Sequence, residues 1–251
     1  LDADSVDLWK DVEGFFSGDP RELPDAVLKN HLNYEEAAEL SYYGAHILHP
    51  ETIPPLRAKK IPLRLFSFTT SFSPESRHTL IDGAGGETTE SITGIASTDN
   101  IGIITVGGSD VGSEPGILAR LTGRLTGGGI NIKSVMTSQT SINILVEAGD
   151  LETAHEILGE ESSSGRSVTY SDMFSLVSLV GNGINSAPGI AARAFQALAE
   201  KKIPVHMICA GASPVSAYFI VRRALRRDAV HTVHNAFFNT REVLYETPAV
   251  H

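Results

Sequence analysis

The chain has 251 residues, a net charge of −10 at pH 7, 41% hydrophobic residues and 20% charged residues. This length allows one large domain or two to three small ones, and the ordinary charged fraction argues against disorder. The acidic balance argues against a nucleic-acid partner, because phosphate binding needs clustered Lys and Arg. The one basic cluster, Arg222-Arg223 with Arg226-Arg227, is interpreted as a solvated helix start.

Cysteine content and hydropathy exclude further classes. Cys209 is the only cysteine, so the chain has neither an intrachain disulfide nor a cysteine-based metal cage. No run of about 18 apolar residues predicts a membrane span. We expect a reducing, cytoplasmic setting, no signal peptide and no bound metal. The first residue is Leu rather than Met, so we expect a piece of a longer protein.

Residues 1–84 predict a partial α/β unit that opens with a strand and a glycine-containing loop. The strand covers Ser5–Trp9, and Gly18 and Pro20 lie in the loop that follows. A strand ending in Lys10-Asp11 before a glycine loop is common at the nucleotide-binding edges of α/β proteins. An ordinary strand-to-turn transition is the simpler interpretation of these residues alone.

Two helices and two strands follow in this unit. Asn33 and Glu36 have the spacing of a capping box, which predicts a helix start. A second helix is expected over Glu51–Lys60, whose prolines are tolerable only in the first turn. The strands at Pro62–Phe68 and Thr79–Ile81 are too few for a complete doubly wound sheet. We therefore expect the N-terminal part of that sheet to be missing.

An internal repeat organises the rest of the chain. Residues 101–147 and 176–221 each predict a strand, a glycine-containing loop, a helix and two further strands. Pro115-Gly116 in the first copy matches Pro188-Gly189 in the second at an offset of 73 residues. The same offset relates Gly108 to Gly181, Ile130 to Ile203 and Ser138 to Gly211. A constant offset indicates a duplicated module rather than two unrelated α/β segments with similar turns.

The pattern also predicts how the two modules are connected. A helix over Leu151–Leu158 and a closing strand over Ser167–Ser171 complete the first copy. The second copy has a helix over Asp228–Phe238 but no convincing closing strand. The strand Ser91–Ser97, which follows the glycine-rich linker Gly83–Glu90, can fill that place. We therefore expect the first module to be inserted within the second, with ligand or partner sites between them.

Two segments resemble a known family. Trp9–Arg21 reads WKDVEGFFSGDPR and resembles the TDV-G-Y-T-DPR segment of the aspartate kinases. Tyr34–Ile53 reads YEEAAELSYYGAHILHPETI and is similar to that family's EA-EL-YFGAKVLHP-T segment. Ile61-Pro62-Leu63 and His78–Ile81 continue the match. The repeat resembles the paired ACT regulatory domains of these enzymes, with the first inserted in the second.

The resemblance implies an α/β (α+β in the regulatory part) fold: the remnant of an amino-acid-kinase α/β sandwich, then two ferredoxin-like βαββαβ ACT domains. The expected bounds are 1–84 for the C-terminal part of the kinase domain, 99–172 for the first ACT domain, and 89–98 plus 173–247 for the second.

The resemblance also implies an activity. An aspartate kinase phosphorylates the β-carboxylate of L-aspartate with ATP and Mg²⁺, for lysine, threonine and methionine biosynthesis. The family's N-terminal phosphate-binding segments do not occur in this chain, and we expect no homoserine dehydrogenase domain within it. Because phosphoryl transfer depends on positioning by those segments, we expect the catalytic residues outside the chain. The fragment alone is expected to be inactive and to hold no cofactor tightly.

The implied ATP-binding residues are Lys10, Asp11, Phe16, Arg21 and His46. Asp11 matches an aspartate near the ribose or adenine, and Arg21 matches a phosphate-side arginine whose forked donors suit that role. Lys10 stands where Thr is usual, Phe16 where Tyr is usual, and His46 where Lys is frequent. Because a neutral imidazole neutralises phosphate less well than an ammonium group, the substitution at His46 puts that contact in question.

The implied effector site lies in the first ACT domain. The loop Gly107–Pro115 ends at a helix N-terminus, where free N–H groups and the helix dipole suit a carboxylate. The implied effector-binding residues are Val111, Glu114, Gly116, Ile117, Leu118, Ile132, Lys133, Thr137, Ser138 and Gln139. Lys133 replaces an aspartate of lysine-inhibited relatives and would repel a ligand ammonium. We expect threonine or another neutral ligand, or none, and a helix-starting loop without a ligand stays the alternative.

Two functions of different classes remain open on the sequence alone. One is a feedback-regulated aspartate kinase, and the other is a stand-alone amino-acid-sensing ACT protein without kinase activity. The retained segments 9–21 and 34–50 favour the first. We expect a homodimer through the ACT domains, with the second copy serving mainly in packing. A dinucleotide site at Gly107–Gly112 is disfavoured, because its glycine spacing is wrong.

Overall fold

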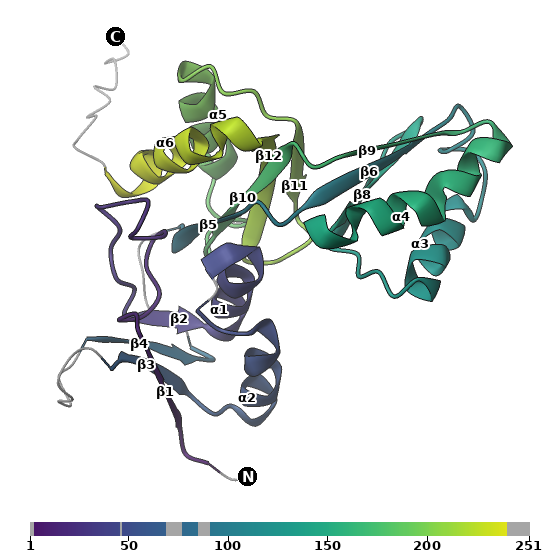
Figure 1. The fold of residues 1–251 in the computed structure, drawn as a ribbon. Helices are drawn as coiled ribbons and strands as arrows, with labels where there is room; N and C mark the ends of the chain where they lie inside the picture. The colour runs from purple at the N-terminus through teal and green to yellow at the C-terminus, as the bar shows by residue number, and fades with distance from the viewer. Residues whose placement is uncertain (1–2, 46, 69–76, 85–90, 240–251) are drawn as a thin grey trace.

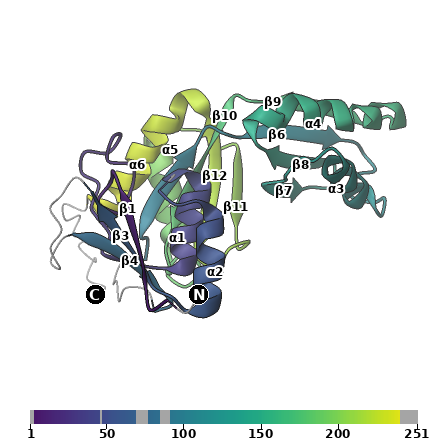
Figure 2. The same ribbon diagram turned by 60° about the horizontal axis from the view of Figure 1, so that its bottom comes forward.

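The computed structural model describes residues 3–45, 47–68, 77–84 and 91–239, which form three four-stranded sheets with helices packed on them (Figures 1 and 2). The first sheet, in the N-terminal unit, has the strand order β1-β3-β4-β2. Its strands pair parallel at its two ends and antiparallel in the middle. The elements of this unit are β1 (Val6–Lys10), β2 (His31–Asn33), α1 (Tyr34–Leu40), the π-helical turn η1 (Ser41–Ala45), the 3-10 turn η2 (Pro50–Thr52), α2 (Ile53–Lys59), β3 (Leu63–Ser67) and β4 (His78–Asp82).

The predicted capping box is present at the start of α1. The Asn33 side chain accepts a hydrogen bond from the Glu36 N–H at 2.7 Å, and the Glu36 carboxylate accepts one from the Asn33 N–H at 3.0 Å. Helix α2 begins two residues later than predicted, because η2 occupies the residues before it. Most of the predicted loop Ser71–His78 and most of the predicted linker Gly83–Glu90 lie outside the described residues.

The first repeat unit has the strand order β7-β8-β6-β9, with α3 and α4 packed on one face of the sheet. Its elements are β6 (Gly102–Gly107), α3 (Ile117–Gly127), β7 (Ser134–Thr137), β8 (Ser141–Val146), the 3-10 turn η3 (Ala148–Asp150), α4 (Leu151–Leu158), the 3-10 turn η4 (Gly159–Ser164) and β9 (Ser167–Ser171). Strand β7 is shorter than the predicted strand Ile130–Met136. Pairing with β8 begins only at Ser134 and runs to Thr137.

The second repeat unit has the strand order β11-β12-β10-β5, with α5 and α6 packed on one face. Its elements are β5 (Gly94–Thr98), β10 (Phe174–Val180), α5 (Ile190–Glu200), β11 (Met207–Ala210), β12 (Ser216–Arg222), the 3-10 turn η5 (Arg223–Leu225) and α6 (Arg226–Phe238). Strand β5 pairs antiparallel with β10, from Leu176 opposite Thr98 to Val180 opposite Gly94. The first unit is therefore inserted within the second, as the sequence predicted.

The backbone repeats in detail at the two ends of helices α3 and α5. Gly116 and Gly189 precede these helices with φ of 88° and 85°. A left-handed residue at this place explains why α3 begins at Ile117 rather than at the predicted Pro115. After the helices, Gly129 and Lys202 also share a positive φ, of 73° and 55°. Lysine has taken the place of glycine there without changing the turn.

The N-terminal unit packs on the free face of the second repeat unit. Figure 1 shows α1 between the N-terminal sheet and the sheet that contains β5, β10 and β12. Ala96 and Val180 belong to the same hydrophobic cluster as Leu40 of α1. Gly44 of η1 approaches β5 so closely that a Cβ there would lie 2.1 Å from the Ser97 carbonyl oxygen. This position therefore excludes every side chain.

Three side-chain hydrogen bonds join α1 and its cap to the second repeat unit. The Thr93 hydroxyl donates to the buried Glu36 carboxylate at 2.5 Å, and the Ser216 hydroxyl donates to Glu39 at 2.6 Å. The Asn33 amide donates to the Asn182 side chain at 2.7 Å. Both carboxylates thus have a partner from the other unit, so the contact is specific as well as apolar. Within the described residues, no helix is both long enough and apolar enough to span a bilayer.

Candidate nucleotide and effector sites

The predicted nucleotide-side residues line one cavity of about 740 Å³. Lys10 and Asp11 come from the end of β1, and Phe16 and Arg21 come from the loop that follows it. This loop contains no named helix or strand, and its own order comes from an isolated bridge between Phe16 and Leu28 and from backbone turns over residues 19–26. The structure thus brings four of the five predicted residues together, while His46 lies outside the described residues.

Arg21 is the best placed of these residues to meet a phosphate group. Its side chain is 85% exposed, and its guanidinium donates to both carboxylate oxygens of Asp19, at 2.6 to 3.1 Å. These hydrogen bonds lower the pKa of Asp19. An exposed ion pair contributes at most about 1 kcal/mol, so a phosphate group can take over these donors at little cost.

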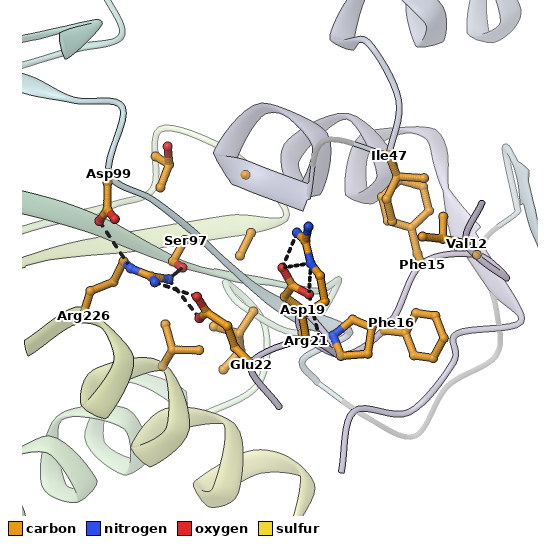
Figure 3. A pocket seen from close by; sticks show the side chains of 18 of the residues that line it. Val12, Phe15, Phe16, Asp19, Arg21, Glu22, Ile47, Ser97, Asp99 and Arg226 are labelled. Carbon is orange, nitrogen blue, oxygen red and sulfur yellow. Dashed lines mark hydrogen bonds and ion pairs between the residues drawn. The ribbon is translucent and has the colours of Figure 1, made fainter. Parts of the chain in front are cut away.

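The second repeat unit supplies the opposite wall of the cavity, which the sequence did not predict. Ser97, Asp99 and Arg226 line it, and Figure 3 shows Arg226 in contact with Glu22, Ser97 and Asp99. The interpretation of the arginine cluster as a solvated helix start is therefore wrong for Arg226, whose side chain is only 20% exposed. The ion pair with Glu22 raises the pKa of Arg226.

A second cavity, of about 340 Å³, lies between the loop before α3 and the end of β7. Eight of the ten predicted effector residues line it, together with Gly112 and Ile142. The N–H groups in the first turn of α3 have no partners within the helix and border this space. Such donors, at the positive end of a helix dipole, suit a carboxylate.

Ile132 and Lys133 do not line this cavity. The Lys133 ammonium forms an ion pair with Glu147 at 3.1 Å and lies over the Tyr42 ring at 4.9 Å. Its side chain is 13% exposed. The direct repulsion of a ligand ammonium expected from the sequence does not follow from this geometry, because the charge is paired away from the cavity.

Arg166 holds the effector loop in place. Its guanidinium, 4% exposed, contacts Asp110 at 2.6 Å, Glu114 at 2.6 Å and the buried Glu161 at 2.9 Å. Hydrogen bonds from Arg166 lower the pKa of Asp110, and those from Arg120, then Arg166, lower the pKa of Glu161. This arginine was not predicted from the sequence, since a lone Arg after a polar loop carries no recognisable spacing.

The corresponding place in the second repeat unit has Ala or Gly at four of the positions that line the second cavity in the first unit. Ala187 stands at the position of Glu114, and Ala210, Gly211 and Ala212 stand at the positions of Thr137, Ser138 and Gln139. The Asn185 amide donates to the Ser213 and Pro214 carbonyls at 2.9 and 3.1 Å. The two facing loops are thus tied directly to each other.

Comparisons with known proteins agree with this division. The amino acid kinase family matches residues 1–67, and two ACT domain families match residues 96–160 and 177–237. The fold and both cavities therefore define a segment of an amino acid kinase joined to a tandem of ACT domains. The N-terminal unit is the kinase segment, and the first and second repeat units are the first and second ACT domains.

The individual proteins that the chain resembles are aspartokinases. The bifunctional aspartokinase/homoserine dehydrogenase of Haemophilus influenzae is 32% identical over 252 residues, which is 97% of this chain and 31% of that protein. Two crystal structures of E. coli aspartokinase III, one with aspartate and ADP and one with lysine and aspartate, superpose with TM-scores of 0.82 and 0.77 at 28% identity. Each match covers 94% of this chain. It covers 53% of the aspartokinase III chain in the first structure and 52% in the second.

A crystal structure of aspartokinase alpha and beta subunits is matched over nearly its whole length. It is 30% identical with a TM-score of 0.53, and the match covers 58% of this chain and 98% of that one. The chain belongs to the aspartokinase family. It spans about a third of the length of the first curated relative.

Proposed function

We propose that this chain is the nucleotide-side and regulatory portion of an aspartate kinase, which transfers the γ-phosphoryl group of ATP to the β-carboxylate of L-aspartate. The observation that carries the proposal is the cavity around Lys10, Asp11, Phe16 and Arg21. Phe16 supplies an apolar wall for the base or sugar, and Arg21 supplies forked donors for phosphate oxygens. Mg²⁺ enters with ATP and neutralises the phosphate charge.

The activity is tested on the protein expressed from its complete reading frame. Aspartyl phosphate formed from ATP and aspartate can be trapped with hydroxylamine and measured. We expect Arg21→Ala to raise the KM for ATP about tenfold or more, since a charge-assisted bidentate contact is lost. Arg57→Ala, in α2 and not among the residues that line this cavity, is the control and should leave this KM unchanged. A protein that binds amino acids but forms no aspartyl phosphate would support the sensor alternative.

For the effector we propose an amino acid with a neutral side chain, such as threonine. Glu114 is the one carboxylate that lines the second cavity within the described residues, and it is already paired with Arg166. No free acid therefore remains for a lysine side-chain ammonium, whereas Thr137, Ser138 and Gln139 offer hydrogen bonds to a hydroxyl. Titration calorimetry with threonine and lysine decides the point, and tighter binding of lysine would contradict the proposal.

The proposal includes the assembly in which these sites work. We place the kinase segment at 1–84, the first ACT domain at 99–172, and the second at 89–98 plus 173–247. Limited proteolysis should cut first near these junctions. A homodimer through the ACT domains, in a reducing cytoplasmic setting, completes the proposal, and light scattering after size exclusion measures the dimer. A monomer at micromolar concentration would contradict this part.

A further inference from the structure

The loop that carries the nucleotide-side residues is shaped by a helix of the regulatory part. Residues 11–30 connect β1 to β2 with a single isolated bridge between Phe16 and Leu28. Backbone hydrogen bonds from the Ser17 N–H to the Val27 carbonyl and from the Lys29 N–H to the Phe15 carbonyl hold its two ends together, while its middle packs against a neighbouring partner. Here that partner is helix α6, together with the edge strand β5.

Apolar and backbone contacts fix the middle of the loop. Leu23 is only 2% exposed and lies in the hydrophobic cluster of the second ACT domain, with Val230 and Val233 of α6. The Ile95 N–H of β5 donates to the Ser17 carbonyl at 2.8 Å. The loop therefore completes the core and one edge of a domain to which it does not belong in sequence.

Two polar contacts fix the loop on either side of Leu23. Arg226 donates two hydrogen bonds to the Glu22 carboxylate, at 2.6 and 2.9 Å. His234, which is fully buried, contacts the Ser17 hydroxyl at 2.9 Å through Nε2. The same hydroxyl accepts a hydrogen bond from the Val27 N–H at 2.9 Å, so His234 also supports the turn that closes the loop.

These contacts come from one face of α6, because Arg226, Val230, Val233 and His234 recur at helical spacing. They hold Ser17 and Glu22, which flank Asp19 and Arg21 in the cavity wall. We propose that α6 of the second ACT domain positions the nucleotide-side loop, with Arg226 and His234 as positioning residues for the kinase reaction. The inference rests on the proposed function, and it assigns the second ACT domain a role in nucleotide binding that acts through the loop.

The first experiment compares two adjacent arginines in the protein expressed from its complete reading frame. Arg226→Met removes the tether to Glu22, whereas Arg227→Met changes an exposed residue in the same helical turn. We expect Arg226→Met to raise the KM for ATP about tenfold, as loss of a preorganised charge-assisted contact does. The KM for aspartate and kcat should change less than about twofold, and Arg227→Met should match the wild type. Equal ATP KM values for both variants would overturn the proposal.

Charge reversal separates positioning from simple misfolding. Arg226→Glu should weaken ATP binding, and the double variant Arg226→Glu with Glu22→Arg should recover most of it, because the ion pair is restored with opposite polarity. A double variant no better than the single one would overturn the role of this pair.

Two substitutions that differ in hydrogen-bonding capacity test the role of His234. His234→Gln keeps a side-chain N–H near the position of Nε2, and His234→Leu does not. We expect the ATP KM to rise in the Leu variant and to stay close to wild type in the Gln variant. Equal KM values in the two variants would overturn the role of His234.

Failure of the proposed function remains distinguishable from failure of this inference. Hydrogen exchange reports the Ser17, Val27 and Ile95 amides without any kinase reaction. Faster exchange there in Arg226→Met than in Arg227→Met supports the tether even if no aspartyl phosphate forms. Unchanged exchange, together with an unchanged ATP KM, would overturn it while leaving the kinase activity intact.

Discussion

The two ACT domains share one fold but differ in what covers the free face of each sheet. In the second domain, α1 and η1 lie over this face, and Ser178 is fully buried there. In the first domain the equivalent residue, Thr105, is half-buried and bonds to Asn143 at 2.8 Å. The first domain has polar groups around its loop cavity, whereas the second has Ala or Gly at four of the equivalent positions. The two domains thus differ in how they use equivalent surfaces: the first keeps an open loop cavity, and the second packs against the kinase segment.

The largest expected effect comes from placing a charge on the two equivalent faces. Ser178→Lys buries an ammonium beneath α1, which should cost on the order of 3–5 kcal/mol of unfolding free energy. Thr105→Lys, 73 residues earlier, lets the ammonium reach water and should cost less than about 1 kcal/mol. Urea denaturation of the two variants measures the difference. Equal costs would show that the two faces are covered to the same extent.

A second pair of equivalent residues tests the ion-pair network of the first domain. Arg120 bonds to the buried Glu161 at 3.1 Å, whereas Arg193, at the same place in the second domain, lies over the Phe237 ring at 4.9 Å. Arg120→Met should lower the melting temperature more than Arg193→Met, because it takes a partner from a buried carboxylate. It should also weaken threonine binding, since Glu161 and Glu114 share Arg166. The reverse order of melting temperatures would contradict this comparison.

A third pair tests what the copies have in common. Gly116→Ala and Gly189→Ala each force a residue with a side chain into a left-handed conformation with no neighbouring atom within 4 Å. Each should therefore cost about 1 kcal/mol through backbone strain alone. Calorimetry of both single variants and the double variant should show equal and additive losses. A large difference between the two would mean that the turns are not equivalent.

The smallest expected effect is a change in the pH dependence of stability. Burial lowers the pKa of His234 from its usual value of 6.5, Lys29 and His231 act in the same direction, and Asp25 opposes them. Below pH 6.5 the unfolded chain therefore binds a proton that the folded chain does not, so stability falls as the pH decreases. His234→Gln should flatten this fall between pH 6.5 and 5, measured by denaturant midpoints, and leave the slope above pH 7 unchanged. An unaltered slope below pH 6.5 would contradict the assignment.

The nested topology could be predicted from the sequence because the constant offset of the repeat defines both modules and shows that the second lacks a closing strand. The matched glycines mark the turns, and the strand at Ser91–Ser97 had no other partner within the pattern. The contacts between units left no such record. Arg226 and Glu22 are 204 residues apart, and a helical pattern shows only which face of α6 is apolar. Lys133 is instructive in the same way, since its position could be aligned but its partner, Glu147, follows only from the folded arrangement of β7 and β8.

The antiparallel pairing of β5 with β10 has a consequence for synthesis. On the ribosome, β5 emerges before the whole of the first ACT domain, and its partner β10 emerges after it. The inserted domain can therefore fold before β10 is available to pair with Ile95 and the rest of β5. The nucleotide-side loop gains its contacts with α6 later than β5 gains its pairing with β10, because α6 is the last helix in the described part of the chain. We therefore expect the first ACT domain to fold before the second, although the second begins earlier in the chain.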